Sequence, residues 1–249
     1  MHLIMRSLIP IAAVAALAAC GARKHHDTIA KQGEQMRVEL AETYIAKGAP
    51  RAAIPLLQRA IAERPGDPRV RVLYGTVLRD LGLYAQAEQQ FRFALAQEPG
   101  FAPAHAGLGI LFDLRRETGQ ALKHHRRAVK LAPGQASYRN NLGFSLYLSG
   151  DTEAAIAQLE RALALDPALA VGYNNIGFAY GRLGEFDKAE RSFRAVGSRP
   201  ATLINMSLVY EEHGDDERAA TLREQAYALA PDLRPIATTG ATTEGKEMQ

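Results

Sequence analysis

The side chains that could carry out catalysis or bind a metal are few, and their spacing suits neither task. His124 and His125 are adjacent, and neighbouring residues of a helix point about 100° apart, so the two imidazoles cannot readily share one metal ion. One acidic cluster comprises Glu211, Glu212, Asp215, Asp216 and Glu217. It lacks the residue order of a calcium-binding loop, and a solvated surface cluster explains it.

The glycines and the nucleophilic side chains give no catalytic pattern either. The glycines never form the clustered G-x-x-x-x-G-K-[ST] loop that holds nucleotide phosphates. No nucleophile, general base and orienting residue can be combined into one site. We therefore predict that the chain is not an enzyme and that it has no metal, no cofactor and no small-molecule substrate.

Cys20 is the only cysteine of the 249 residues, and it follows a segment with the features of an export signal. Arg6 precedes an apolar run over residues 8–19, which is too short to span a bilayer. Residues 1–19 are therefore predicted to be a signal peptide. The small residues at 16–18, Ala-Leu-Ala, would also fit ordinary cleavage close to Cys20.

The tetrapeptide Leu17-Ala18-Ala19-Cys20 resembles the lipobox of bacterial lipoproteins. This resemblance implies that Cys20 is lipidated and becomes the first residue of the mature protein, with a diacylglyceryl thioether and an N-acyl chain that together anchor it stably. Gly21, rather than aspartate, follows the cysteine, which in this family implies the outer membrane and a position on its periplasmic face. Residues 20–33 would form the lipidated N-terminus and a polar tether.

From residue 34 to residue 233 the sequence repeats, mostly with a step of 34 residues. Each repeat has one small residue and an alanine twelve positions later. The small residues are Ala41, Gly75, Gly109, Gly143, Gly177 and Ser207, and the alanines are Ala53, Ala87, Ala121, Ala155, Ala189 and Ala219. A period of this length indicates a solenoid of stacked units. Apolar residues at helical spacing on both sides of a turn give each unit two amphipathic helices.

The packing within a unit follows from these side-chain sizes. The small residue on the first helix lets the second helix approach closely, and a bulky residue three positions later fills the layer between them. The bulky residues are Tyr44, Leu78, Phe112, Leu146, Tyr180 and Tyr210. The second helix contributes Leu57, Phe91, Leu159 and Phe193 to the same layer. His125 occupies this second-helix position in the third unit, so we predict that it lies in the core.

This pattern resembles the tetratricopeptide repeat (TPR). The resemblance implies an all-α fold, a right-handed α-solenoid of about six TPR helix pairs over residues 34–233. The Thr- and Gly-rich residues 234–249 are predicted to be a disordered tail. Pro55 lies inside the second helix of the first unit and should kink or weaken it. The fifth unit is about one helical turn short, because Tyr180 and Tyr210 are only 30 residues apart.

In tetratricopeptide arrays the first helices line the concave surface, and this resemblance places seven residues there. They are Asn140, Phe144, Tyr147, Asn174, Phe178, Arg182 and Ile204. Amide and aromatic side chains suit an extended protein segment or a helix, with asparagines bonded to its backbone. Asn140 and Asn174 could equally bond to neighbouring groups of the array, so a binding role and a structural role are both open for them.

Charge is distributed unevenly along the chain, although the formal net charge is only +3. Residues 68–135 hold ten Lys or Arg against five Asp or Glu, and residues 136–233 hold nine against fourteen. Four cations at i, i+3, i+4 and i+7 line one face of a helix. This basic stripe consists of Lys123, Arg126, Arg127 and Lys130. It is either a solvated outer face or a contact for lipid phosphates or an acidic partner. The export signal argues against a nucleic-acid partner.

The lipobox, the six repeats, the short fifth unit and the helix from Ile204 to Tyr210 together resemble the TadD family, lipoproteins of the tight-adherence (Flp pilus) secretion system. The resemblance implies a non-catalytic scaffold, lipid-anchored in the outer membrane, that assists pilus or secretin assembly. Its partner would be the secretin or another pilus component. Two alternatives stay open, namely a type IV pilus pilotin of the PilF/PilW type and a generic periplasmic TPR adaptor for envelope or polysaccharide assembly.

Overall fold

The computed structural model describes residues 32–33 and 35–234. Every regular element in this part of the chain is a helix, which confirms the all-α prediction there. None of the helices described is both long enough and apolar enough to cross a membrane. The predicted signal peptide, the lipidation at Cys20, nearly all of the tether and the tail after Arg234 lie outside the described residues.

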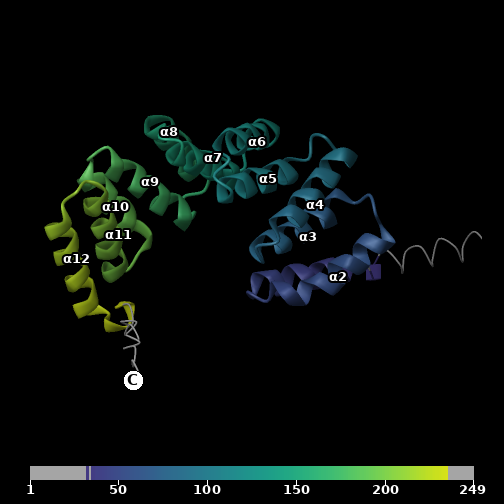
Figure 1. Ribbon diagram of the computed structural model, residues 1–249, viewed down its shortest axis with the longest axis horizontal. Coiled ribbons are helices and arrows are strands. Elements are labelled where there is room, and N and C mark those ends of the chain that lie inside the picture. Colours follow the sequence, from purple (N-terminus) through teal and green to yellow (C-terminus); the bar gives the residue numbers. More distant parts are fainter. Residues whose placement is uncertain (1–31, 34, 235–249) are drawn as a thin grey trace, which may run out of the picture. The chain divides into compact units, whose positions relative to one another are not determined.

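The helices form two compact units, one that ends at Glu117 and one that begins at Thr118. Figure 1 labels the helices of both units. In the first unit, a helix over residues 35–46 is followed by α2 (Pro50–Glu63), α3 (Pro68–Asp80), α4 (Tyr84–Gln97) and α5 (Ala102–Leu114). The second unit contains α6 (Thr118–Leu131), α7 (Ala136–Leu148), α8 (Thr152–Leu165), α9 (Ala170–Arg182), α10 (Phe186–Val196), α11 (Arg199–Glu212), α12 (Asp216–Leu229) and a short 3-10 helix at Pro231–Leu233. Within each unit, consecutive helices pack against each other, as the predicted repeats require.

Local capping explains where several helices begin. Asp67, Asp151, Ser198 and Asp215 each precede a helix, and each side chain accepts a hydrogen bond from a backbone N–H in the first turn. Such caps satisfy donors that have no partner within the helix. Proline stands at the first or second position of α2, α3, α5 and α11, where its missing N–H costs no hydrogen bond. Pro55 lies inside α2, as predicted, and the helix continues through it.

The close contact predicted between the two helices of a repeat is confirmed at three glycines. A Cβ atom on Gly75, Gly143 or Gly177 would lie 2.8, 2.7 or 2.4 Å from Phe91, Leu159 or Phe193, respectively. These three bulky side chains are fully buried. Any larger residue at the glycine positions would therefore have to push the two helices apart.

The remaining core positions agree with the repeat pattern and add to it. The six predicted alanines, Ala53, Ala87, Ala121, Ala155, Ala189 and Ala219, are fully buried. His125 is also buried, as predicted for its place in the core. The pattern did not single out Gly107, where a Cβ atom would lie 2.6 Å from Phe91. The Phe91 ring therefore packs against a glycine of α3 and a glycine of α5.

The shortening predicted for the fifth unit is confirmed. α10 has 11 residues, whereas α4, α6, α8 and α12 each have 14. Only Gly197 and Ser198 connect α10 to α11, while residues 166–169 connect α8 to α9. The chain therefore reaches the sixth repeat about one helical turn early.

A residue with positive φ closes the turn between the first and second helices of each repeat. In five repeats this residue is glycine, namely Gly48, Gly82, Gly150, Gly184 and Gly214. In the third repeat it is Arg116, with φ of 60°. For a side chain with a Cβ atom, the left-handed conformation costs about 1–2 kcal/mol. The third repeat therefore has a strained turn that the other repeats avoid.

Arg116→Gly is expected to stabilise the protein by about 0.5–1 kcal/mol, because the relief of strain exceeds the entropy that glycine adds to the unfolded chain. Gly150→Ala, at the same turn position of the fourth repeat, should destabilise it by a similar amount. The midpoint of urea unfolding measures both effects. A lower midpoint for Arg116→Gly would contradict this explanation of the turn.

Candidate partner-binding site

The seven residues predicted to contact a partner lie on three helices of the second unit. Asn140, Phe144 and Tyr147 are on α7, Asn174, Phe178 and Arg182 are on α9, and Ile204 is on α11. α9 contacts both α7 and α11. The fold therefore brings the first helices of the last three repeats together, as the prediction requires. We call these seven residues and their neighbours on α7, α9 and α11 the first-helix surface.

Asparagines link the three helices of this surface. Asn175 donates from Nδ2 to Asn140 Oδ1 at 2.9 Å, and Asn140 donates in turn to Asn141 Oδ1 at 3.4 Å. Asn205 donates to Asn174 Oδ1 at 3.4 Å. Asn140 is only 5% exposed, so its amide serves the array. Asn174 is half-buried, and within the described residues its Nδ2 group has no acceptor, so it can still donate to a partner.

Arg182, Tyr147 and Glu212 form a cluster that joins the same three helices. The Arg182 guanidinium lies 3.5 Å from the centroid of the Tyr147 ring and donates from Nη1 to the Tyr147 carbonyl oxygen at 2.6 Å. Its Nε donates to Glu212 Oε1 at 2.7 Å, and the Tyr147 hydroxyl donates to Glu212 Oε2 at 3.4 Å. Burial raises the pKa of the Tyr147 phenol, with Arg182 opposing the shift and Glu212 adding to it. The charge of Arg182 is thus already compensated within the array.

The two phenylalanines of the predicted set have different environments. Phe144 is 39% exposed, and its ring stacks beside Tyr147 with 6.5 Å between the centroids. The ring of Phe178 meets the buried ring of Phe193 edge-on at 5.0 Å, and Phe178 packs against the core of the fifth and sixth repeats. Phe144 is therefore available to a partner. Phe178 has a structural role that the sequence did not indicate.

Sequence reasoning missed several residues of the first-helix surface. Glu212 was interpreted as part of a solvated acidic cluster, yet it pairs with Arg182 across two helices. Asn205 lies 30 residues after Asn175, so the shortened last step of the repeat was the pattern that could have found it. Three exposed apolar residues, Leu148, Val171 and Leu208, lie on the same three helices. They enlarge the apolar area that a partner segment could cover.

The basic stripe lies on α6, and all four of its side chains are exposed. α6 contains no Asp or Glu. Within the described part of the chain, none of the four cations is in an ion pair. Like charges at this spacing are mildly destabilising in a helix. The exposure of the stripe is compatible with both interpretations of it, a solvated outer face and a contact for an anionic partner.

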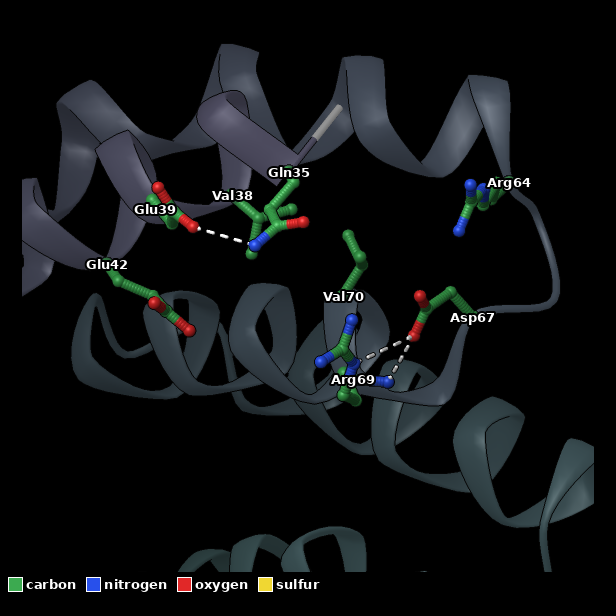
Figure 2. Close-up of a pocket in the computed structure, with 8 residues that line it drawn as sticks. All are labelled: Gln35, Val38, Glu39, Glu42, Arg64, Asp67, Arg69 and Val70. Atoms are coloured by element: carbon green, nitrogen blue, oxygen red, sulfur yellow. Dashed lines mark hydrogen bonds and ion pairs between the residues drawn. The ribbon is translucent and has the colours of Figure 1, made fainter. Parts of the chain in front are cut away.

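A hollow of about 360 Å³ in the first unit carries charges of both signs (Figure 2). Glu39 and Glu42 line it from the first described helix, and Arg69 lines it from the start of α3. Asp67 is occupied as the cap of α3, since its Oδ1 accepts from the Arg69 backbone N–H at 2.8 Å. Across residues 32–33 and 35–234, no three His, Cys, Asp or Glu side chains come together to hold a metal ion.

Comparison with known protein families identifies the repeats. Residues 44–106 and 202–236 match the family described as tetratricopeptide repeat, and residues 145–184 match the one described as TPR repeat. The chain is therefore a tetratricopeptide-repeat protein, which confirms this part of the predicted resemblance. Repeats of this family typically form scaffolds for protein interaction.

Several solved structures share the architecture. PilW, a type IV pilus biogenesis factor, has a TM-score of 0.69 and 19% identity, and the match covers 80% of this chain and 94% of PilW. PilF of Pseudomonas aeruginosa has a TM-score of 0.65 and 17% identity, covering 81% and 93% of the two chains. YrrB, a TPR protein with an unusual peptide-binding site, has a TM-score of 0.54 and 20% identity, covering 71% and 93%. At these identities the likeness shows the fold alone.

One curated relative matches a short segment. The Vi polysaccharide export protein VexE of Salmonella typhi is 42% identical over 60 residues, which are 24% of this chain. The chain spans only 9% of the length of VexE.

Phe144→Ala is expected to lower the free energy of unfolding by only about 0.5–1 kcal/mol, because the ring is 39% exposed and mainly loses its stacking contact with Tyr147. Phe178→Ala should lower it by about 1–3 kcal/mol, because the ring packs on Phe193. Urea unfolding followed by circular dichroism compares the two variants. Equal losses of stability would show that Phe144 is also a core residue.

Proposed function

We propose that this protein is a non-catalytic scaffold, lipid-anchored in the outer membrane and facing the periplasm, that assists assembly of a tight-adherence (Flp) pilus or its secretin. The observation that carries the proposal is the first-helix surface, which combines exposed apolar side chains with a fixed polar framework. Such a surface suits an extended segment or a helix of a partner protein. The partner would be the secretin or another pilus component.

One feature supports the role in pilus assembly, and another supports the lipid anchor. The match covers 94% of the solved PilW chain and 93% of the solved PilF chain, so a helical array of similar length supports a similar scaffold role. The sequence Leu17-Ala18-Ala19-Cys20 after an apolar run supports acylation of Cys20. A pilus pilotin and a TadD-type lipoprotein would both have this combination.

A second candidate function is an adaptor for the export or assembly of a surface polysaccharide. The segment that is 42% identical to part of the Vi polysaccharide export protein VexE favours it. Both candidates use the same repeats as a protein-binding scaffold. They differ in which surface structure a cell loses when the gene is deleted.

Deletion of the gene is expected to abolish surface pili, and a Phe144→Ala gene should restore them poorly. Loss of an exposed aromatic contact can cost over 1 kcal/mol of binding, about fivefold or more in affinity. Leu165→Ala, which alters a similarly exposed apolar residue on α8, is the matched control and should restore pili fully. Electron microscopy of the cells, with staining for surface polysaccharide, gives the readout.

The other outcomes of this experiment each exclude one part of the proposal. Normal pili in the deletion strain with loss of surface polysaccharide would replace the pilus role by the adaptor role. A third outcome is normal pili with Phe144→Ala and loss of pili with the double variant Lys123→Glu and Arg127→Glu. This outcome would show that the basic stripe, rather than the first-helix surface, binds the partner.

Cys20→Ser is expected to give a folded protein that leaves the membrane fraction, because Cys20 precedes the repeat pattern of residues 34–233 that builds the core. Metabolic labelling with palmitate should mark the wild-type protein and not the variant. Equal label in both proteins would exclude lipidation at Cys20.

A further inference from the structure

A second hollow, of about 550 Å³, lies where the shortened fifth repeat meets the sixth. α10 contributes Glu190 and Arg194, the connection contributes Gly197, and α11 contributes Arg199, Thr202 and Leu203. All six residues belong to the second unit. None of them is one of the seven predicted partner-contact residues, although Leu203 is next to Ile204 on α11.

The hollow arises because the period breaks here. A half-buried apolar residue recurs near the end of the second helix at a step of 34 residues, as Ile61, Leu95, Val129 and Leu163. Leu163 packs so closely on the next helix that a Cβ atom on Gly172 would lie 2.9 Å from its Cδ2. The next residue in this series is Gly197, which has no side chain. The position equivalent to Gly172, 30 residues later, is Thr202.

Thr202 brings an unsatisfied polar group to the base of the hollow. The residue is 4% exposed, and its Oγ1 has no hydrogen-bond partner among the described residues. A Cβ atom on Gly197 would lie 3.6 Å from this oxygen, so the hydroxyl faces the space that a side chain at position 197 would fill. The same position of the second and third repeats holds the buried apolar residues Val70 and Ala104. A buried hydroxyl without a partner is costly, so an acceptor in the hollow would stabilise the site.

The charges around the hollow favour an anion. Arg199 has no ion pair within residues 35–234, and Arg194 has only a long contact of 3.8 Å with Glu190. The two guanidinium groups and the one carboxylate leave an excess of one positive charge. Arg199 also begins α11, so the positive end of a 14-residue helix dipole lies at the same place.

We propose that this hollow binds a carboxylate group of a partner protein, held by Arg194, Arg199 and the Thr202 hydroxyl, with an adjoining apolar side chain on Leu203. A single carboxylate balances the excess of one positive charge, whereas a doubly charged phosphate would exceed it. Guanidinium groups form paired hydrogen bonds with carboxylates. The inference rests on the proposed scaffold role in one respect, namely that the carboxylate belongs to a partner protein. Binding of a carboxylate by the hollow can be measured on the isolated protein.

The test uses the purified protein with Cys20→Ser and follows the backbone amide signals of residues 197–199 and 201–203 by NMR. The probes are N-acetyl-leucine, which carries a carboxylate and an apolar side chain, the uncharged N-acetyl-leucinamide, and inorganic phosphate. N-acetyl-leucine should bind, and Arg199→Gln should weaken it about tenfold through loss of a charged hydrogen bond. Arg191→Gln, on α10 but outside the lining of the hollow, is the matched control and should leave binding unchanged.

Thr202→Val supplies a second measurement. It should weaken binding of N-acetyl-leucine without lowering the melting temperature, because the hydroxyl is unsatisfied in the free protein. A lower melting temperature without any effect on binding would mean that the hydroxyl bonds a buried water only, and would overturn the proposal. The proposal would also be overturned if N-acetyl-leucinamide bound as tightly as N-acetyl-leucine, or if phosphate bound more tightly. The same holds if Arg191→Gln weakened binding of N-acetyl-leucine as much as Arg199→Gln does. Pilus formation is a separate readout, so a failure here leaves the scaffold role standing.

Discussion

The close approach of two helices at a glycine is the contact on which the repeats depend. Phe91 illustrates it, because its ring fills the space left by the missing side chains of Gly75 and Gly107 on two different helices. Neither helix of a repeat could bury its apolar stripe alone. The Phe91 ring therefore packs both against the first helix of its own repeat and against the first helix of the next repeat. α10 has only 11 residues, so Gly197 stands at the position that Leu163 occupies one repeat earlier, and no side chain packs on the next helix there.

Polar contacts then fix the first helices of the second unit relative to one another. Asn175 bonds to Asn140, and Arg182 pairs with Glu212, so neighbouring repeats are joined by directional bonds in addition to apolar packing. Buried polar groups need such partners. The consequence is that some side chains of binding type serve the framework, while Phe144 and the exposed leucines remain accessible to a partner.

The two surfaces suited to binding differ in physical character. The first-helix surface offers apolar contact on a framework whose polar groups are largely satisfied. The hollow beside Gly197 offers a positive charge excess and an unsatisfied Thr202 hydroxyl, and it exists because the repeat is interrupted. Departures from local regularity often mark functional sites, since a stable fold gains nothing from them. One partner that carries both an apolar segment and a carboxylate could use both.

The sequence by itself determined the helices, the six repeats, the pairing of glycines with bulky side chains and the short fifth unit. It could do so because each of these depends on residues within one repeat, whose sizes and spacing recur. Only the tertiary structure decided which candidate binding residues are free. Arg182 is compensated by Glu212, 30 residues away, and Phe178 packs on Phe193 of the following helix. These contacts depend on the direction of side chains across helices, which residue type and spacing along the chain do not specify.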